Sequence, residues 1–196
     1  MIVGKIIHSN AHTDYVCQVY RKDEVENPPA REDFAIGSFV RLHLADDQSL
    51  VGLVYDTRLF NPEFGRLGPR LSPEADLEVF APDYLSEKAT LIGIAAVGTI
   101  DGDGPHQGFP PLAVDTDAMV ETMPDEEIRA FHLEGDALRL AYAPLLLASG
   151  SPHALHLIQT VLERLSELLP EHAETLALLK DDVSWKAAIT PLGGDR

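Results

Sequence analysis

The stretch ATLIGIAAVGTI, residues 89–100, is a long β-type run with glycines at positions 93 and 98. Its Ile, Val and Thr content predicts a strand, and glycines inside a strand indicate bulges or sharp bends. Earlier runs have the same character: Ile2–His8, Asp14–Tyr20, Ile36–Leu44 and Leu50–Leu59, the last with Gly52 inside it. Several short strands with little helix between them predict a small antiparallel β-barrel over residues 1–100.

The two N-terminal runs are predicted to form a hairpin. Asp14–Tyr20, DYVCQVY, alternates its side chains with the period of two that is typical of a strand, and the turn-like SNAHTD precedes it. The following segment, Arg21–Asp33, is polar and contains a Pro-Pro pair, which indicates an exposed loop.

The composition changes after residue 100. The stretch DGDGPHQG, residues 101–108, is rich in turn formers and is interpreted as a hinge. Residues 109–187 are predicted to form an acidic helical subdomain and residues 188–196 a tail. The predicted fold class is therefore α+β, a small barrel followed by helices.

Helical periodicity is clearest in the last third of the chain. Acidic residues after Pro124 suit the first turn of a helix, and Ser151-Pro152 is a good start for the next one, which runs to Leu169. Its apolar face covers nearly half of the helix circumference, wider than one neighbour requires. The face is predicted to pack on two neighbours or on a partner. A final helix is expected over Glu171–Trp185.

The charge restricts the possible partners. The chain has a formal net charge of −17, with nine Lys/Arg against fifteen Asp/Glu in residues 1–100 and six against seventeen in residues 101–196. Because nucleic-acid affinity depends on cationic groups that release counterions, we expect no direct nucleic-acid binding by this chain alone. Such a charge favours a basic protein partner.

Cys17 is the only cysteine, so the chain can form neither an intrachain disulfide nor a zinc site built from several cysteines. No apolar run reaches the about 20 residues of a membrane helix, and the N-terminal stretch lacks the pattern of a signal peptide. These observations predict a cytoplasmic protein without a membrane segment.

No catalytic motif can be assembled. The sequence lacks GxxxxGK[ST], a GxGxxG that opens a helix, and GxSxG. His8, His12 and Asp14 form HxxxHxD and could gather around a metal, but polar residues at a turn explain them better. His153 and His156 are assigned to a helix start, and Cys17 to a buried, inert thiol. We expect no catalytic residue, no cofactor and no metal.

The stretch FNPEFGRLGPRLSP, Phe60–Pro73, is the locally basic exception. Its prolines make it stiff, and its apolar side chains need cover. It either folds onto its own barrel, with its arginines paired to nearby acids such as Asp56 or Glu78, or docks against another subunit.

Five segments together resemble the HAS-barrel, the small barrel that precedes the motor domain in HerA-type translocases and in F-type ATP synthase subunits. They are MIVGKII, DYVCQVY, FAIGSFVRLHL, SLVGLVYDT and KATLIGIAAVG, with Gly4, Gly37 and Gly52 at the family's glycine positions. The resemblance covers roughly residues 1–100. The sequence departs from the family after the barrel, where an acidic helical segment stands in place of the motor domain.

The resemblance implies a stand-alone barrel that serves as a non-enzymatic adaptor or assembly subunit of a HerA-like hexameric ATPase. Such a system, together with a NurA-like nuclease, acts in DNA end processing or repair. The protein is expected to be a homo-oligomer. The alternatives are a metal-dependent hydrolase using His8, His12 and Asp14, and a self-assembling structural ring. The expected interface residues are Phe60, Phe64, Arg66, Arg70, Leu157, Val161 and Leu168.

Overall fold

The structure is a computed structural model that describes residues 1–44, 48–61, 88–148 and 153–189. Its long strands are β1 (Ile2–Ala11), β2 (Asp14–Val19), β3 (Phe39–His43), β4 (Ser49–Phe60) and β5 (Ala89–Asp101). Two short strands follow, β6 (Gly104–Gln107) and β7 (Met119–Thr122). The five strand runs and the first hairpin predicted from the sequence are confirmed. The third run is shorter than expected because the chain turns at Gly37, whose φ is +90°.

Six antiparallel strands close into a barrel. The order is β2-β1-β7-β3-β4-β5, and β5 pairs again with β2, from Asp14 opposite Ala95 to Gln18 opposite Leu91. Beyond this seam β5 pairs with β6 instead. The predicted fold class, an antiparallel barrel followed by helices, is confirmed.

Two register shifts in the β4–β5 ladder bend the sheet. Val97 is the extra residue between the pairs Val51–Gly98 and Gly52–Ala96, and Tyr55 is the extra residue between Val54–Ile94 and Asp56–Gly93. The bulges that the glycines indicated therefore exist. A Cβ at position 52 would lie 2.4 Å from the Cγ2 of Ile94, so only glycine lets the walls approach this closely.

The domain boundary expected at residue 100 needs correction. Residues 101–108 are not a hinge, because β6 lies within them and continues the sheet as a hairpin with β5. Residues 109–187 are not wholly helical either, since β7 closes the barrel between β1 and β3. A four-residue strand carries too little periodicity to be recognised locally, and its hydrogen-bond partners are distant in sequence.

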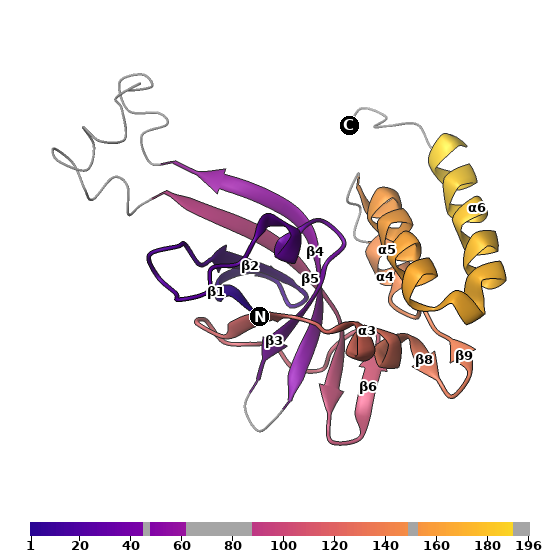
Figure 1. Cartoon of the computed structure of the whole chain (residues 1–196), viewed down its shortest axis with the longest axis horizontal. Helices are drawn as coiled ribbons and strands as arrows, with labels where there is room; N and C mark the ends of the chain where they lie inside the picture. Colours follow the sequence, from indigo (N-terminus) through magenta and orange to yellow (C-terminus); the bar gives the residue numbers. More distant parts are fainter. Residues whose placement is uncertain (45–47, 62–87, 149–152, 190–196) are drawn as a thin grey trace, which may run out of the picture.

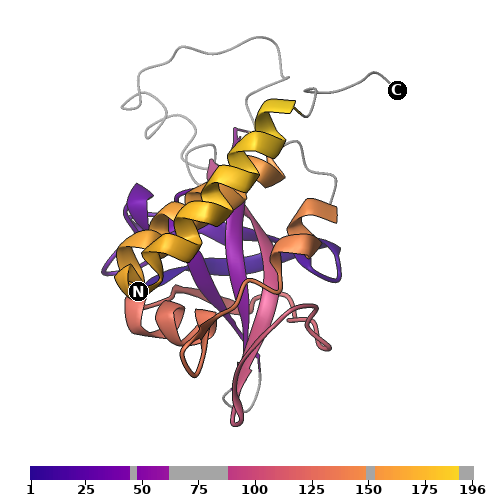
Figure 2. The same cartoon turned by 90° about the vertical axis from the view of Figure 1, so that its right-hand side faces the viewer.

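Most of the remaining elements lie on one side of the barrel (Figures 1 and 2), whereas Phe34 of the 3-10 helix η1 packs against the barrel interior. The remaining elements are the 3-10 helix η1 (Arg31–Phe34), α3 (Asp125–His132), the hairpin β8 (Leu133–Glu134) and β9 (Ala137–Leu138), α4 (Ala143–Ala148), α5 (Ala154–Leu168), the 3-10 helix η2 (Pro170–His172) and α6 (Ala173–Ile189). The helices expected after Pro124, up to Leu169 and after Glu171 are confirmed, although Ser151-Pro152 lies outside the described residues.

Apolar side chains form two cores on opposite faces of β4 and β5. Leu50, Val54, Ile92 and Ile94 point into the barrel, whereas Val51 and its neighbours on the outer face pack against the helices. Both faces of these strands are buried, which explains their nearly continuous apolar sequence.

Hydrogen bonds and ion pairs of two arginines connect α3 with α5 and η2. Arg129 donates to the backbone carbonyl of Leu168 at the end of α5, and its Nη2 lies 2.7 Å from Oε1 of Glu171. Arg164 of α5 lies 2.7 Å from Oδ1 of Asp125 at the start of α3. Arg129 is the single base between Asp101 and Asp136 in the sequence, and the fold uses it to satisfy a helix end.

Candidate functional site

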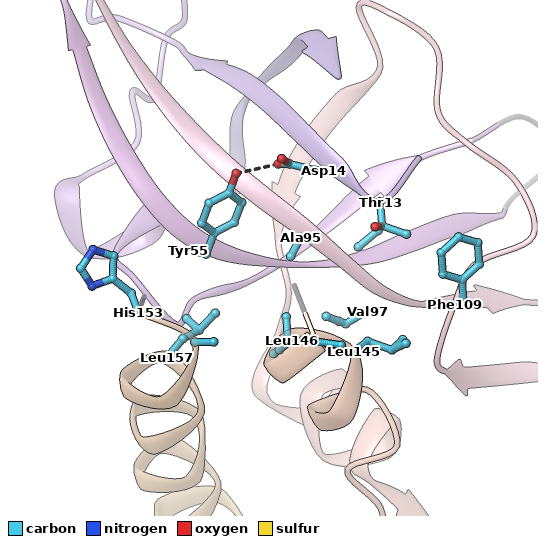
Figure 3. A pocket seen from close by; sticks show the side chains of 13 residues that line it. Thr13, Asp14, Tyr55, Ala95, Val97, Phe109, Leu145, Leu146, His153 and Leu157 are labelled. Atoms are coloured by element: carbon cyan, nitrogen blue, oxygen red, sulfur yellow. Dashed lines mark hydrogen bonds between the residues drawn. The ribbon is translucent and has the colours of Figure 1, made fainter. Parts of the chain in front are cut away.

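A pocket of about 340 Å³ opens between the barrel wall and the helices α4 and α5 (Figure 3). A volume of this order is in the range of small-molecule sites. The lining combines strand residues with helix residues: Thr13, Asp14, Tyr55, Ala95, Ala96, Val97, Phe109, Leu145, Leu146, Ala148, His153, Ala154 and Leu157.

The polar wall of this pocket is a hydrogen-bonded pair. The hydroxyl of Tyr55 donates to Oδ1 of Asp14 at 2.6 Å, and the amide of Asn10 donates to Oδ2 at 3.1 Å. Burial, and then the hydrogen bond to and charge of Asp14, raise the pKa of Tyr55. The phenol therefore stays protonated and remains a donor.

The fold places this pair by means of a bulge and a glycine. Tyr55 is the extra residue of β4, so its ring leaves the regular ladder and crosses β5 at Gly93. A Cβ on Gly93 would lie 2.8 Å from Cζ of Tyr55. The absence of a side chain at position 93 is what lets the ring pass over β5 toward Asp14 at the start of β2.

The opposite wall is apolar. Leu146 and Leu157 are buried, and Leu145 is 39% exposed at the mouth. In Figure 3 the leucines of α4 and α5 lie across from Asp14 and Tyr55. The ring of Phe109 closes one end and stacks on His12, with centroids 5.1 Å apart. A ligand here would meet a carboxylate on one side and, on the other, hydrocarbon together with the exposed imidazole of His153 at the start of α5.

The predicted alternative metal site is not assembled. His8 is exposed on β1, whereas His12 places Nε2 2.9 Å from the carbonyl oxygen of Pro110. Asp14 instead receives Tyr55 and Asn10. Among the residues that the structure describes, no three His, Cys, Asp or Glu side chains come close enough to hold a metal. The hydrolase interpretation has no support from this geometry.

The helix residues expected at an interface lie inside the protein. Leu157 and Val161 are 4% and 1% exposed, and Leu168 is half-buried against the same core. The wide apolar face of α5 is used within the chain, because α5 contacts α3, α4 and α6 and packs on the barrel. The apolar face is therefore covered within the chain, by more than the two neighbours expected, and these side chains are not open to a partner in this conformation.

Of the four interface residues predicted in the stretch Phe60–Pro73, the structure describes only Phe60. Phe60 ends β4 and is 54% exposed, next to Leu59 at 82%. Arg58 pairs with Asp56 at 2.9 Å, one of the acids proposed for the local arginines. Phe64, Arg66 and Arg70 lie outside the described residues.

Helix α6 carries two exposed apolar residues that were not predicted as a contact surface. Leu178 and Trp185 are 71% and 66% exposed. They are seven residues apart and so lie on one face of the helix, with the exposed carboxylates of Asp181 and Asp182 between them. The helix was predicted, and plotting its apolar residues around the axis would have placed this pair away from Leu176 and Val183, which are buried.

Two buried titratable groups are structural. Burial raises the pKa of the Cys17 thiol to about 12, so it is not a nucleophile at neutral pH, as the sequence indicated. Burial lowers the pKa of His132 to about 4. Its ring lies 2.7 Å from the carbonyl oxygen of Ile128 and 2.8 Å from the hydroxyl of Tyr142. A neutral imidazole satisfies both, as donor from Nδ1 to the carbonyl and acceptor at Nε2 from the hydroxyl.

Comparison with known proteins identifies a family over nearly the whole chain. Residues 1–191 match the family described as "Domain of unknown function (DUF8166)". The chain belongs to this family. The match spans the barrel and the helices together, so the family unit contains both walls of the pocket. No curated protein matches the chain. Within the described residues, no helix has the length and apolar character to cross a membrane.

Proposed function

We propose that this protein is a non-enzymatic adaptor or assembly subunit of a HerA-like DNA translocase system. In that role its barrel would be of the HAS type and would contact the hexameric ATPase and a NurA-like nuclease. It would act in DNA end processing or repair in the cytoplasm, as a homo-oligomer.

One observation carries the proposal. The five segments that resemble the HAS-barrel are the strands β1 to β5, and together with β7 they form the closed barrel. The glycines of the resemblance stand at close approaches: a Cβ on Gly4 would lie 2.0 Å from the backbone oxygen of Gln18, and one on Gly52 would meet Ile94. These two close approaches between barrel strands support the proposal, whereas a Cβ on Gly37 would lie 2.6 Å from Cγ2 of Thr160 on α5.

Exposed apolar residues offer the contact surfaces. The ends of β4 and β5 project as a ribbon away from the helices (Figure 1), with Leu59 and Phe60 exposed on it. Leu178 and Trp185 form the second surface, on α6, where Asp181 supplies negative charge and Asp182 pairs with Lys186 at 2.6 Å. Aromatic anchors are typical of protein interfaces, and the net charge of −17 suits a basic partner.

The test is the mass of the protein in solution, measured by light scattering alone and with a HerA-type ATPase from the same cell. The proposal expects a defined larger complex that weakens at high salt, because charges steer the association. A species that keeps its own mass in the presence of the ATPase contradicts the adaptor role. If that species is a closed oligomer, the self-assembling ring is the better description.

Variants locate the contact. Leu178→Ala with Trp185→Ala should weaken the complex at least tenfold, as truncation of an interface anchor does. Phe60→Ala tests the ribbon in the same way. Leu112→Ala is the matched control, because Leu112 is 52% exposed on the loop before β7 and belongs to neither surface. Equal binding by all variants would exclude both surfaces.

A further inference from the structure

We infer that the pocket between the barrel and α4–α5 binds a small amphipathic organic cation, an amine with a compact apolar body. This site is independent of the proposed adaptor role, because it uses side chains that belong to neither contact surface.

The polar wall of the pocket carries hydrogen-bond acceptors. A carboxylate has capacity for about four hydrogen bonds through its two oxygens, and Tyr55 and Asn10 supply two of those to Asp14. The tyrosine hydroxyl is committed as a donor to Asp14, so the pair presents acceptor character to the pocket. The complementary ligand group is a cationic donor, and an ammonium fits it, whereas a carboxylate would be repelled.

The apolar wall and the volume of the pocket restrict the rest of the ligand. Leu146 and Leu157 face the polar pair across the pocket, and Leu145 and Phe109 line it further. At roughly 30 Å³ for each water-sized group, the 340 Å³ holds about ten non-hydrogen atoms. That is an aromatic ring or a short branched chain carrying one amine.

The wall that holds Asp14 is rigid, because it is built from paired strands. Tyr55 and Asp14 stand on β4 and β2, which are joined through β5, and Gly93 leaves the gap that the ring occupies. Preorganised acceptors lose little entropy when a ligand binds. The net charge of −17 also raises the local concentration of cations near the protein.

The experiment titrates the isotope-labelled full chain with three probes of one shape, followed by amide NMR at pH 7. The probes are 2-phenylethylamine, the neutral 2-phenylethanol and the anionic 3-phenylpropanoate. We expect the amine to shift the amides of Thr13, Asp14 and residues 95–97, and to bind at least tenfold more tightly than the alcohol. The anion should bind more weakly still.

Asp14→Asn separates charge from shape, since asparagine keeps an acceptor for Tyr55. It should weaken the amine at least tenfold and leave the alcohol unchanged. Asp117→Asn is the matched control: its carboxylate pairs with Lys5 at 3.0 Å, and its side chain is 75% exposed outside the pocket. Ala95→Leu, which extends hydrocarbon into the pocket, should abolish shifts by all probes that bind there.

Three results would overturn the inference: equal affinities for amine and alcohol, shifts spread over the surface without focus on the pocket, or unchanged amine binding in Asp14→Asn. A thermal melt of each variant shows whether it is folded. Should Asp14→Asn fail to fold, the ratio of the wild-type affinities for amine and alcohol decides. A ratio near one overturns the inference. A ratio of ten or more, with binding lost in Ala95→Leu, supports it.

Discussion

The neutral His132 makes the stability of this protein sensitive to acid. Its ring is fully buried among Phe39, Phe131 and Tyr142, and burial lowers its pKa from an ordinary 6.5 to about 4. In the unfolded chain the imidazole returns to its ordinary pKa and takes up a proton first. Between pH 6.5 and 4 the unfolded state therefore binds more protons, so the free energy of unfolding falls as the pH falls.

The magnitude follows from the two pKa values. One unit of pKa difference corresponds to about 1.4 kcal/mol, so the full shift amounts to between about 3 and about 4 kcal/mol. Of this, about 2 kcal/mol is lost between pH 7 and pH 5, where His132 stays neutral in the folded protein and becomes charged in the unfolded one. That is a considerable part of the 5–15 kcal/mol typical of the stability of a domain.

The measurement is urea unfolding at pH 7, 6 and 5 for the wild type and for His132→Phe with Tyr142→Phe. The double change removes the titrating ring without leaving the tyrosine hydroxyl unpaired. The wild type should lose about 2 kcal/mol more than the double variant over this range. Other titrating groups act on both proteins and cancel in the difference. His156→Gln, at an exposed position of α5, should keep the wild-type slope.

Parallel stability curves for wild type and double variant would refute the reasoning. So would an NMR titration in which His132 protonates near pH 6.5 in the folded protein. Either result would mean that water or a counter-charge reaches the ring, contrary to its full burial.

The remaining predictions concern packing and reactivity. Gly52→Ala should destabilise the fold by about 1–3 kcal/mol in chemical denaturation, because its Cβ would overlap Ile94 in a closely packed interior. The control is Gly102→Ala, where nothing lies within 4 Å, and it should change stability by less than about 0.5 kcal/mol. Tyr55→Phe should cost about 1 kcal/mol through the lost bond to Asp14, and a double-mutant cycle with Asp14→Asn should show the two changes to be non-additive. Cys17 should react with a thiol reagent only as fast as the protein unfolds, and rapid labelling of native protein would contradict its burial and its raised pKa.

Local patterns were sufficient wherever the pattern was long. The strand alternation of Asp14–Tyr20 and the apolar runs containing Gly52 and Gly93 predicted β2, β4 and β5, and the glycines marked the bulges that bend the sheet. The helix ending at Leu169 was equally clear from its periodicity. In each case neighbouring residues share one environment, so the sequence carries the signal several times over.

The pocket could not be predicted in this way. Asp14 was grouped with His8 and His12 because they are close in sequence, but the fold turns Asp14 toward Tyr55, 41 residues away. Tyr55 reaches it only because the bulge and Gly93 coincide across two strands. Leu157 was assigned to an outer surface because periodicity reveals an apolar face and is silent about which neighbour covers it.

The sequence by itself determined that this chain is an acidic α+β protein, with β1 to β5 before residue 102, helices in its last third and a buried thiol. It also determined where the sheet bends. Only the tertiary structure decided that β7 closes the barrel, that α5 buries its apolar face inside the chain, and that a carboxylate faces leucines across a pocket. Strand and helix formation follow from short-range periodicity and backbone preference, whereas closure, burial and the pocket depend on contacts between residues far apart in the chain, which no local pattern records.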